Sequence, residues 1–293
     1  MARQACGAGA GGAVKSEVFG FDAYSPKEMA RRVTEACVVK ARLPLLTTAL
    51  LGVLAGAFIG LGALYSTIVA SDATLGFATS RVAGGVCFSL GLLLVVVAGA
   101  ELFTGNNLIA MAWADGCVSL RELLRNWAVV CVANFAGAAG LALMVFYSGH
   151  WEMNSGAVGA AYLKIAAAKA ALTPGRAFML GVLCNVLVCM AMWMALAGRS
   201  VMDKLIAIVF PISAFVAAGF EHSIANMYYF PLALLLKAHG VLLPPGGEGI
   251  TVAGMLGNLG PVIAGNIVGG SVLVALVYWV IYLRGRSPAG DMA

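Results

Sequence analysis

Two short stretches, 99–106 (GAELFTGN) and 219–226 (GFEHSIAN), decide how this chain folds. Both follow the pattern G-x-E-x4-N, and both interrupt a long apolar run with polar side chains. Backbone that leaves helical geometry inside a bilayer is tolerated only where it is buried in protein or lines a watery cavity. The two stretches therefore predict two membrane helices that are broken at mid-depth and that meet around one central pathway.

The composition around these stretches predicts an all-α polytopic membrane protein. Hydrophobic residues make up 61% of the 293 residues and charged residues only 11%, against roughly 25% charged residues in ordinary soluble domains. The mean hydropathy is +0.94. A membrane-spanning helix needs about 20 apolar residues, and we expect six spans in the chain. They cover 43–69, 82–112, 127–147, 177–197, 205–236 and 250–283.

A second pattern, N-x7-N-x2-G, also occurs once in each half of the chain. It covers 126–137 in the third span and 258–269 in the sixth. With three spans per half, the second copy must enter the membrane from the opposite face, so we expect an inverted-topology repeat. Broken helices at corresponding positions of two such halves point to a transport site.

The segments outside the spans complete the predicted organisation. The sequence Ser-Pro-Lys-Glu at 25–28 is typical of a capped helix start, and we expect an amphipathic helix over 25–42 on the cytoplasmic surface. Residues 1–24 are expected to be disordered, 43–285 to form the transmembrane domain, and 286–293 to form a cytoplasmic tail. Lys and Arg are in excess on the side of the N-terminal helix, which places both termini in the cytoplasm.

Several classes of function are disfavoured by the same sequence. The net charge of +5 does not indicate nucleic-acid binding, because the basic residues lie at span ends and form no stripe with interleaved aromatics. The seven cysteines include no C-x-x-C pair and no histidine lies at metal-ligand spacing, so no metal and no cofactor are predicted. No pair of nucleophile and base occurs near mid-depth, so we expect no catalytic residues and no enzyme.

Four residues of the breaks are candidates for contact with a transported solute. His222 is an ionisable side chain inside a span, which is costly and suggests function, although a hydrogen-bonded structural histidine is the alternative. Its ordinary pKa lies near 6.5, so it can exchange a proton near physiological pH. Thr104, Gly105 and Asn106 offer hydroxyl, backbone and amide donors to an anion, or they cap the broken helices.

Other residues near the breaks favour a structural role. Glu101 and Glu221 recur in both halves, and a carboxylate that faces an anion path would repel the anion. We interpret both, with Asn226, as groups that stabilise the breaks by hydrogen bonding. Lys169 is expected in a long loop between the third and fourth spans, as a solvated lysine. The large apolar residues beside the breaks form core packing or a hydrophobic constriction; they are Phe88, Leu92, Leu102, Phe103 and Phe215.

Five motifs together resemble the formate/nitrite transporter family. They are ELFTGN at 101–106, NVLVC at 185–189 followed by Trp193, GRS at 198–200 with MDK at 202–204, GFEHSIANM at 219–227 and IAGNI at 263–267. The resemblance covers about 25–283, and the nine-residue GFEHSIANM string is highly specific. It implies a homopentamer in the bacterial inner membrane, with one pore per protomer, an aquaporin-like fold and a central histidine between two apolar constrictions.

The resemblance also assigns site residues. His222 matches the central histidine, Thr104 the threonine of a mobile loop, Asn266 the asparagine of the sixth span and Lys169 a vestibule lysine, which replaces the solvated-loop interpretation. The constriction positions match the five large apolar residues named above.

The resemblance implies transport of formate or nitrite, with formate favoured, either passively or coupled to protons. Relatives that carry bicarbonate, hydrosulfide, lactate or acetate are the alternatives, and a neutral-solute channel is a further one. A bare ion at mid-bilayer costs about 3 to 17 kcal/mol, which favours passage as the neutral acid. Lys169 would then attract the anion, Thr104 and Asn266 would hold it, and His222 would supply or relay the proton.

Overall fold

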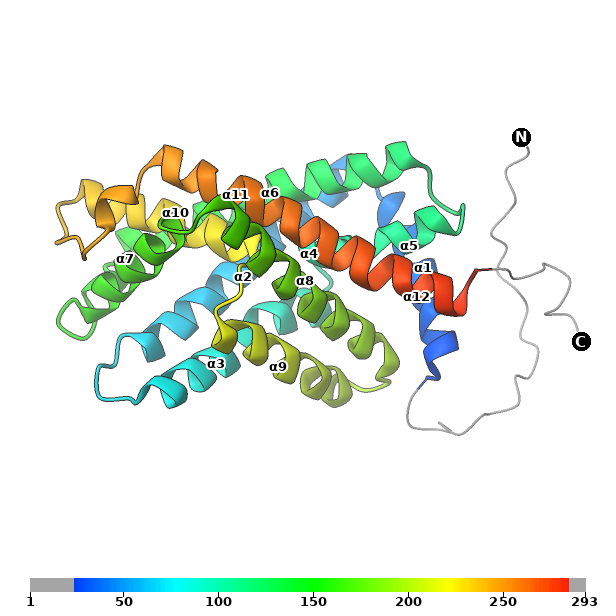
Figure 1. The fold of residues 1–293 in the computed structure, drawn as a ribbon, viewed down its shortest axis with the longest axis horizontal. Helices are drawn as coiled ribbons and strands as arrows, with labels where there is room; N and C mark the ends of the chain where they lie inside the picture. The colour runs from blue at the N-terminus through cyan, green and yellow to red at the C-terminus, as the bar shows by residue number, and fades with distance from the viewer. Residues whose placement is uncertain (1–23, 285–293) are drawn as a thin grey trace, which may run out of the picture.

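The computed structural model describes residues 24–284, and the regular structure of that part of the chain is helical (Figure 1). The α-helices are α1 (Pro26–Ala41), α2 (Leu45–Ala70), α3 (Phe77–Ala98), α4 (Phe103–Asn106), α5 (Ile109–Ala114), α6 (Leu120–Tyr147), α7 (Ala157–Ala170), α8 (Pro174–Ala197), α9 (Val201–Ala218), α10 (Ser223–Ala238), α11 (Val252–Ile267) and α12 (Val277–Tyr282). A π-helical segment, Val268–Leu276, joins α11 to α12. The expected disordered start, apart from residue 24, and the expected tail at 286–293 lie outside the described residues.

Within the described range, six helical stretches are long and apolar enough to cross a membrane. They are α2, α3, α6, α8, α9 and the continuous stretch Val252–Tyr282. The expectation of an all-α protein with six spans is therefore confirmed. The sequence predicts a third span from residue 127, whereas α6 begins at Leu120. Ser119 and Glu122 form a capping box, which lets a charged first turn join the helix.

The second and fifth spans are interrupted at the two G-x-E-x4-N stretches. α3 ends at Ala98 and α9 at Ala218, and each is followed by a glycine with positive φ: Gly99 at 81° and Gly219 at 77°. Residues with a Cβ rarely adopt this conformation, so glycine is the residue that allows the chain to leave the helix there. The chain then runs through extended backbone before α4 and α10 begin.

The two halves of the chain pack in the same way. α2 packs against α3 and α6, and α8 packs in the same manner against α9 and α11. Helix contacts of α2 with α6, and of α8 with the π-helical segment after α11, are close because of glycine. A Cβ at Gly137 would fall 1.9 Å from the carbonyl oxygen of Val53, and one at Gly269 would fall 2.2 Å from that of Val182. Small residues permit such backbone approach between membrane helices. The repeated Gly of N-x7-N-x2-G thus has a packing role in both halves.

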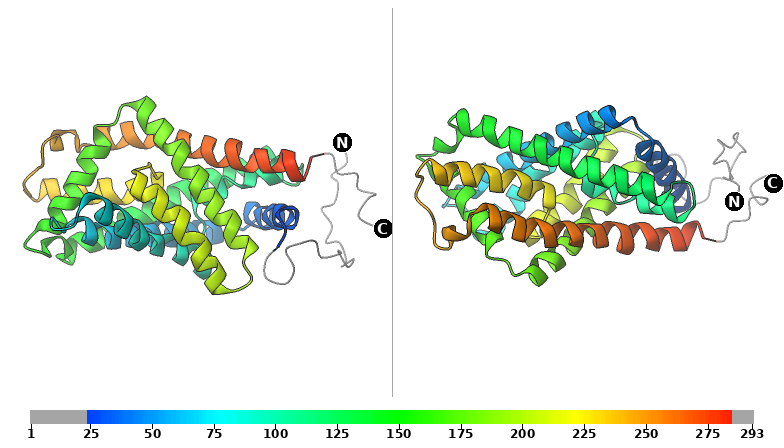
Figure 2. Two further views of the ribbon diagram at one scale, coloured as in Figure 1. Left: turned by 60° about the horizontal axis from the view of Figure 1, so that its bottom comes forward. Right: turned by 90° about the horizontal axis from the view of Figure 1, so that it is seen from above.

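The repeat extends to α1 and α7, which lie at opposite ends of the long axis of the molecule (Figure 1). α1 begins with the capping box that the sequence predicts, at Ser25 and Glu28. Its apolar face is buried, with contacts to α5, α8 and α12, and both views in Figure 2 keep α1 at the same end as α12. α1 is therefore packed into the helical body as the counterpart of α7.

The placement of Lys169 in a loop is wrong, because Lys169 lies in the last turn of α7. This helix is short and rich in alanine, and alanine has the highest helix propensity of any residue. A segment of this length is too short to span a membrane, so a search for apolar spans leaves it between them. Its position at the end of a packed helix holds Lys169 toward the break that precedes α10.

Candidate functional site

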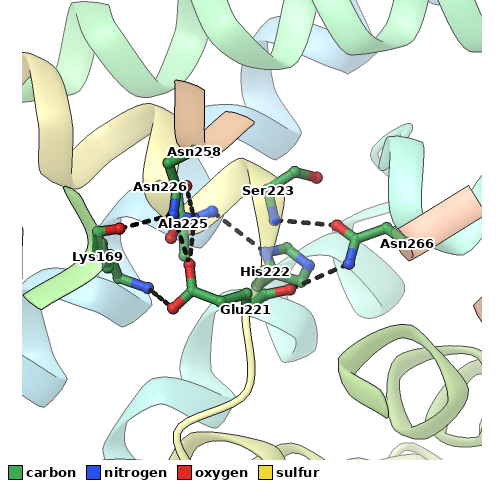
Figure 3. A network of polar contacts seen from close by, with 8 residues as sticks. All are labelled: Lys169, Glu221, His222, Ser223, Ala225, Asn226, Asn258 and Asn266. Atoms are coloured by element: carbon green, nitrogen blue, oxygen red, sulfur yellow. Dashed lines mark hydrogen bonds and ion pairs between the residues drawn. The ribbon is translucent and has the colours of Figure 1, made fainter. Parts of the chain in front are cut away.

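The break between α9 and α10 is held by a buried ion pair (Figure 3). Lys169 Nζ lies 2.8 Å from Glu221 Oε1, and Asn226 Nδ2 donates to Glu221 Oε2 at 2.7 Å. Asn258 of α11 connects both sides, since its Nδ2 donates to Lys169 O at 3.1 Å and its Oδ1 accepts from Asn226 Nδ2 at 2.7 Å. Glu221 is buried, and a buried carboxylate is tolerated where a cation and hydrogen bonds compensate it.

Asn266 binds the backbone of the same break. Its Oδ1 accepts from Ser223 N at 3.0 Å, while Nδ2 donates to Gly181 O at 2.8 Å and to Glu221 O at 3.0 Å (Figure 3). A primary amide has two N–H donors, and both are used here. In this structure Asn266 stabilises the extended backbone and has no free N–H for a solute.

The break between α3 and α4 has the same ion pair and the same amide contacts. Lys40, in the last turn of α1, lies 2.5 Å from Glu101. Asn106 Nδ2 donates to Glu101 at 2.6 Å and to Asn126 at 2.9 Å, and Asn126 Nδ2 donates to Lys40 O at 3.2 Å. Both N–H donors of Asn106 are therefore used within the protein, as those of Asn226 are in the other half.

Asn134 is the counterpart of Asn266. Its Oδ1 accepts from Phe103 N at 2.9 Å, and its Nδ2 donates to Gly52 O at 2.7 Å and to Glu101 O at 2.9 Å. The contacts of the ion pair and of both asparagines of the N-x7-N pattern are thus made twice, once around each break. They form a frame that holds two extended segments inside the membrane domain.

The two frames differ in the residue that follows the glutamate, which is Leu102 in the first half and His222 in the second. The His222 ring uses both nitrogens: Nδ1 accepts from Ala225 N at 3.2 Å, and Nε2 lies 3.0 Å from Thr104 Oγ1. A nitrogen that accepts carries no proton, so these bonds assign the neutral ring a proton on Nε2. His222 therefore caps α10 and faces Thr104 of the other half with its N–H, and a further proton could enter only at Nδ1, in place of the bond from Ala225 N.

Two of the five proposed constriction residues surround this histidine. The rings of Phe88 and Phe215 meet edge to face with centroids 5.6 Å apart, and the Phe215 ring stacks on His222 at 5.7 Å. Both phenylalanines are buried. Together with His222 they line one side of a cavity of about 330 Å³ that also reaches Lys169 and Glu221.

The other three proposed constriction residues, Leu92, Leu102 and Phe103, are buried and do not line this cavity. Thr104 and Gly105 are also buried outside it, and Thr104 reaches His222 from the side of α4. The structure thus places the aromatic pair beside His222 in the lining of the cavity, while the other three apolar candidates do not line it. Gly105 lies beside Met192, which a Cβ would meet at 3.5 Å.

Sequence reasoning missed Lys40 and the structural role of Asn126, Asn134 and Asn258. A signal for Lys40 was present: the segments 40–52 and 169–181 both begin with Lys-Ala and end with Leu-Gly at the same spacing. It was overlooked because Lys40 also fits a surface helix. Sequence reasoning also missed Ser223, for which no sequence signal exists. Its buried Oγ has no hydrogen-bond partner in the described part of the chain.

Comparisons with known proteins agree with this architecture. Residues 27–280 match the formate/nitrite transporter family. Formate channel FocA of Escherichia coli strain K12 is 40% identical over 274 residues, which cover 90% of this chain and 96% of that protein. A solved pentameric formate channel with formate bound is 36% identical with a TM-score of 0.74, covering 82% of this chain and 98% of that chain. A solved FNT family ion channel has a TM-score of 0.77 at 28% identity, covering 87% and 98%. The chain belongs to the formate/nitrite transporter family.

Proposed function

We propose that this protein carries formate across the bacterial inner membrane, with a proton, so that the solute passes the narrowest region as the neutral acid. The observation that carries the proposal is the contact of His222 Nε2 with Thr104 Oγ1 at 3.0 Å, beside the Phe88–Phe215 pair that lines the cavity with His222. A group that can bind a proton therefore lies where the path is apolar. Nitrite is the runner-up solute.

The energetics favour a neutral species at this point. The apolar pair offers no hydrogen bond to a bare anion, and an ion at mid-bilayer costs about 3 to 17 kcal/mol. Protonation removes most of that cost. Since the frame occupies the amide protons of Asn106 and Asn266, the hydroxyl of Thr104 and the His222 N–H remain for the solute, together with the unpartnered hydroxyl of Ser223.

His222 would act through its Nε2. Only the cationic ring is acidic enough to protonate formate. A proton taken up from the cavity at Nδ1 gives that cation, the Nε2 proton then passes to the formate anion, and a neutral ring remains. The cation cannot accept from Ala225 N, so it leaves α10 uncapped. His222 therefore serves as a short-lived relay in this proposal, and the neutral ring is its resting form.

Lys169 would act on the cavity side of the aromatic pair. Its side chain is 13% exposed, and its ammonium group contacts Glu221 at 2.8 Å and lies 5.8 Å from the centre of the Tyr229 ring. We propose that the ammonium group favours entry of an anion, although Glu221 compensates part of its charge. Relatives named as formate channels, among them one described as pentameric, support formate as substrate and a homopentamer as the assembly. We place both termini in the cytoplasm and assign no enzymatic activity.

Proteoliposome flux with a panel of small acids tests the function. We expect formate uptake to exceed that of acetate and lactate, to rise as the external pH falls, and to acidify the lumen. Uptake that is independent of pH, with equal permeability to a neutral solute such as glycerol, would contradict the proposal and favour a neutral-solute channel.

A further inference from the structure

The cavity in front of His222 contains three charged side chains, and only two of them compensate each other. Lys169 and Glu221 form an ion pair at 2.8 Å. The third is Arg81, which lines the same cavity and has no carboxylate within ion-pair distance in the part of the chain that the structure describes. With His222 neutral, the net positive charge of the cavity therefore comes from Arg81.

The structure holds the Arg81 guanidinium in place beside the second break. Arg81 lies near the start of α3, and its Nε donates to Ala217 O at 2.9 Å, at the end of α9. Gly219 leaves room for the group, since a Cβ at that position would fall 2.6 Å from Arg81 Nη2. One edge of the guanidinium is thus bound to the backbone, and the two terminal nitrogens have no hydrogen-bond partner within 24–284.

Lys169 is less suited to first contact with an anion. To bind a solute with its full charge it has to leave Glu221, and breaking a buried ion pair costs several kcal/mol because the partner charge is left uncompensated. Arg81 has no such partner, and a guanidinium presents parallel N–H donors that match the two oxygens of a carboxylate.

We propose that Arg81 is the anion-recruiting residue of this cavity: it raises the local concentration of small carboxylates before they reach Lys169 and the aromatic pair. That the recruited anion is formate rests on the proposed function. That Arg81 attracts anions at all rests on the geometry of the cavity. The counterpart in the other half, at the same distance before the positive-φ glycine, is Val201. An arginine therefore recruits anions on one side of the molecule only.

The electrostatic part can be measured without transport. Ser80 lines the same cavity, and a Ser80→Cys variant provides a thiol there. We would compare its labelling rates with an anionic and a cationic methanethiosulfonate of similar size, counted on the peptide that contains residue 80 so that native cysteines do not contribute. Arg81→Gln should lower the ratio of anionic to cationic labelling about tenfold, because one unit of charge is lost at short range. Arg81→Lys should keep the ratio within about twofold.

Arg176 provides the matched control, because it is an exposed arginine at the start of α8 that does not line the cavity. Arg176→Gln removes the same charge and should leave the ratio within about twofold of its starting value. Equal ratios in the Arg81→Gln and Arg176→Gln proteins would overturn the proposal. Should Arg81→Gln fail to fold, the proposal can be tested on the unaltered protein. Formate should then slow the modification of Arg81 by phenylglyoxal but not that of Arg176. If formate at constant ionic strength did not protect Arg81, the proposal would be overturned.

Measurements of formate uptake test whether Arg81 acts on the proposed substrate. Arg81→Gln should raise the half-saturating formate concentration about tenfold, with the maximal rate largely kept, and should weaken the fall of uptake with added salt. Arg81→Lys should restore the salt dependence. A wild-type protein that carries no formate would contradict the proposed function, whereas the labelling ratio would still report whether Arg81 attracts anions.

Discussion

The two breaks of this protein have nearly the same backbone and different chemistry. Leu102 and His222 precede α4 and α10 with φ/ψ of −106°/124° and −104°/113°. Each follows a glutamate whose carboxylate is held by a lysine and an asparagine. Yet leucine offers only apolar surface, while histidine caps its helix and reaches the other half through Thr104.

This comparison separates scaffold from function. The residues that recur in both halves use their polar groups in hydrogen bonds to the backbone and to each other, and so they hold the extended segments in place. The residues at the Thr104–His222 contact do not recur: Phe103 corresponds to Ser223 in the repeat, Thr104 to Ile224, and Leu102 to His222. Repetition thus marks the frame, and departures from it mark the residues of the proposed pathway.

The largest expected effect comes from breaking either frame. Glu101→Ala and Glu221→Ala should each destabilise the protein by about 3 to 5 kcal/mol, because each leaves a lysine and an asparagine without their partner. Thermal unfolding in detergent measures this. The double variant Lys169→Met/Glu221→Gln should be more stable than Glu221→Ala. A difference between the two glutamate variants of more than about 2 kcal/mol would show that the two frames are not equivalent.

A smaller effect on stability and a large one on flux is expected at Gly105, whose counterpart is Ala225. A Cβ at Gly105 meets only the flexible Met192 side chain, at 3.5 Å, so Gly105→Ala should fold and transport. Gly105→Trp should reduce formate flux at least about tenfold, since the ring has to occupy space next to Thr104.

The control for Gly105→Trp is recovery of folded oligomer in detergent. A folded oligomer with undiminished flux would show that the first break lies off the path.

The smallest effect sharpens the comparison of α1 with α7. α1 is capped by Ser25, whereas α7 begins at Ala157, after Gly156, which offers no side-chain cap. The Ser25 hydrogen bonds also hold the pKa of Glu28 below its ordinary value. Ser25→Ala should cost about 0.5 to 2 kcal/mol, measured as a lower unfolding temperature. The loss should shrink below the pKa of Glu28, where the carboxyl is protonated in both states. Equal losses at neutral and low pH would contradict the ionic part of the cap.

Sequence alone predicted the six spans and the two breaks, because apolar length and the repeated G-x-E-x4-N pattern report directly on membrane helices. The shared Lys-Ala and Leu-Gly spacing of 40–52 and 169–181 indicates that α1 and α7 belong to the repeat. The sequence could not show which groups Lys40 and Lys169 contact, because they reach glutamates far along the chain. Nor could it show that Asn266 uses both amide protons on backbone, since that depends on the packing of α11 against α8.

The central claim is that His222 couples the movement of formate to that of a proton, and His222→Asn tests it most directly. The asparagine Oδ1 can take the place of Nδ1 and still accept from Ala225 N, so the cap of α10 is kept while the titratable group and its contact with Thr104 are lost. Formate uptake and luminal pH would be recorded together in proteoliposomes. We expect one proton to accompany each formate in the wild type, and formate movement in the variant to become electrogenic with little acidification. The same ratio of protons to formate, with the same pH dependence, in both proteins would contradict the account.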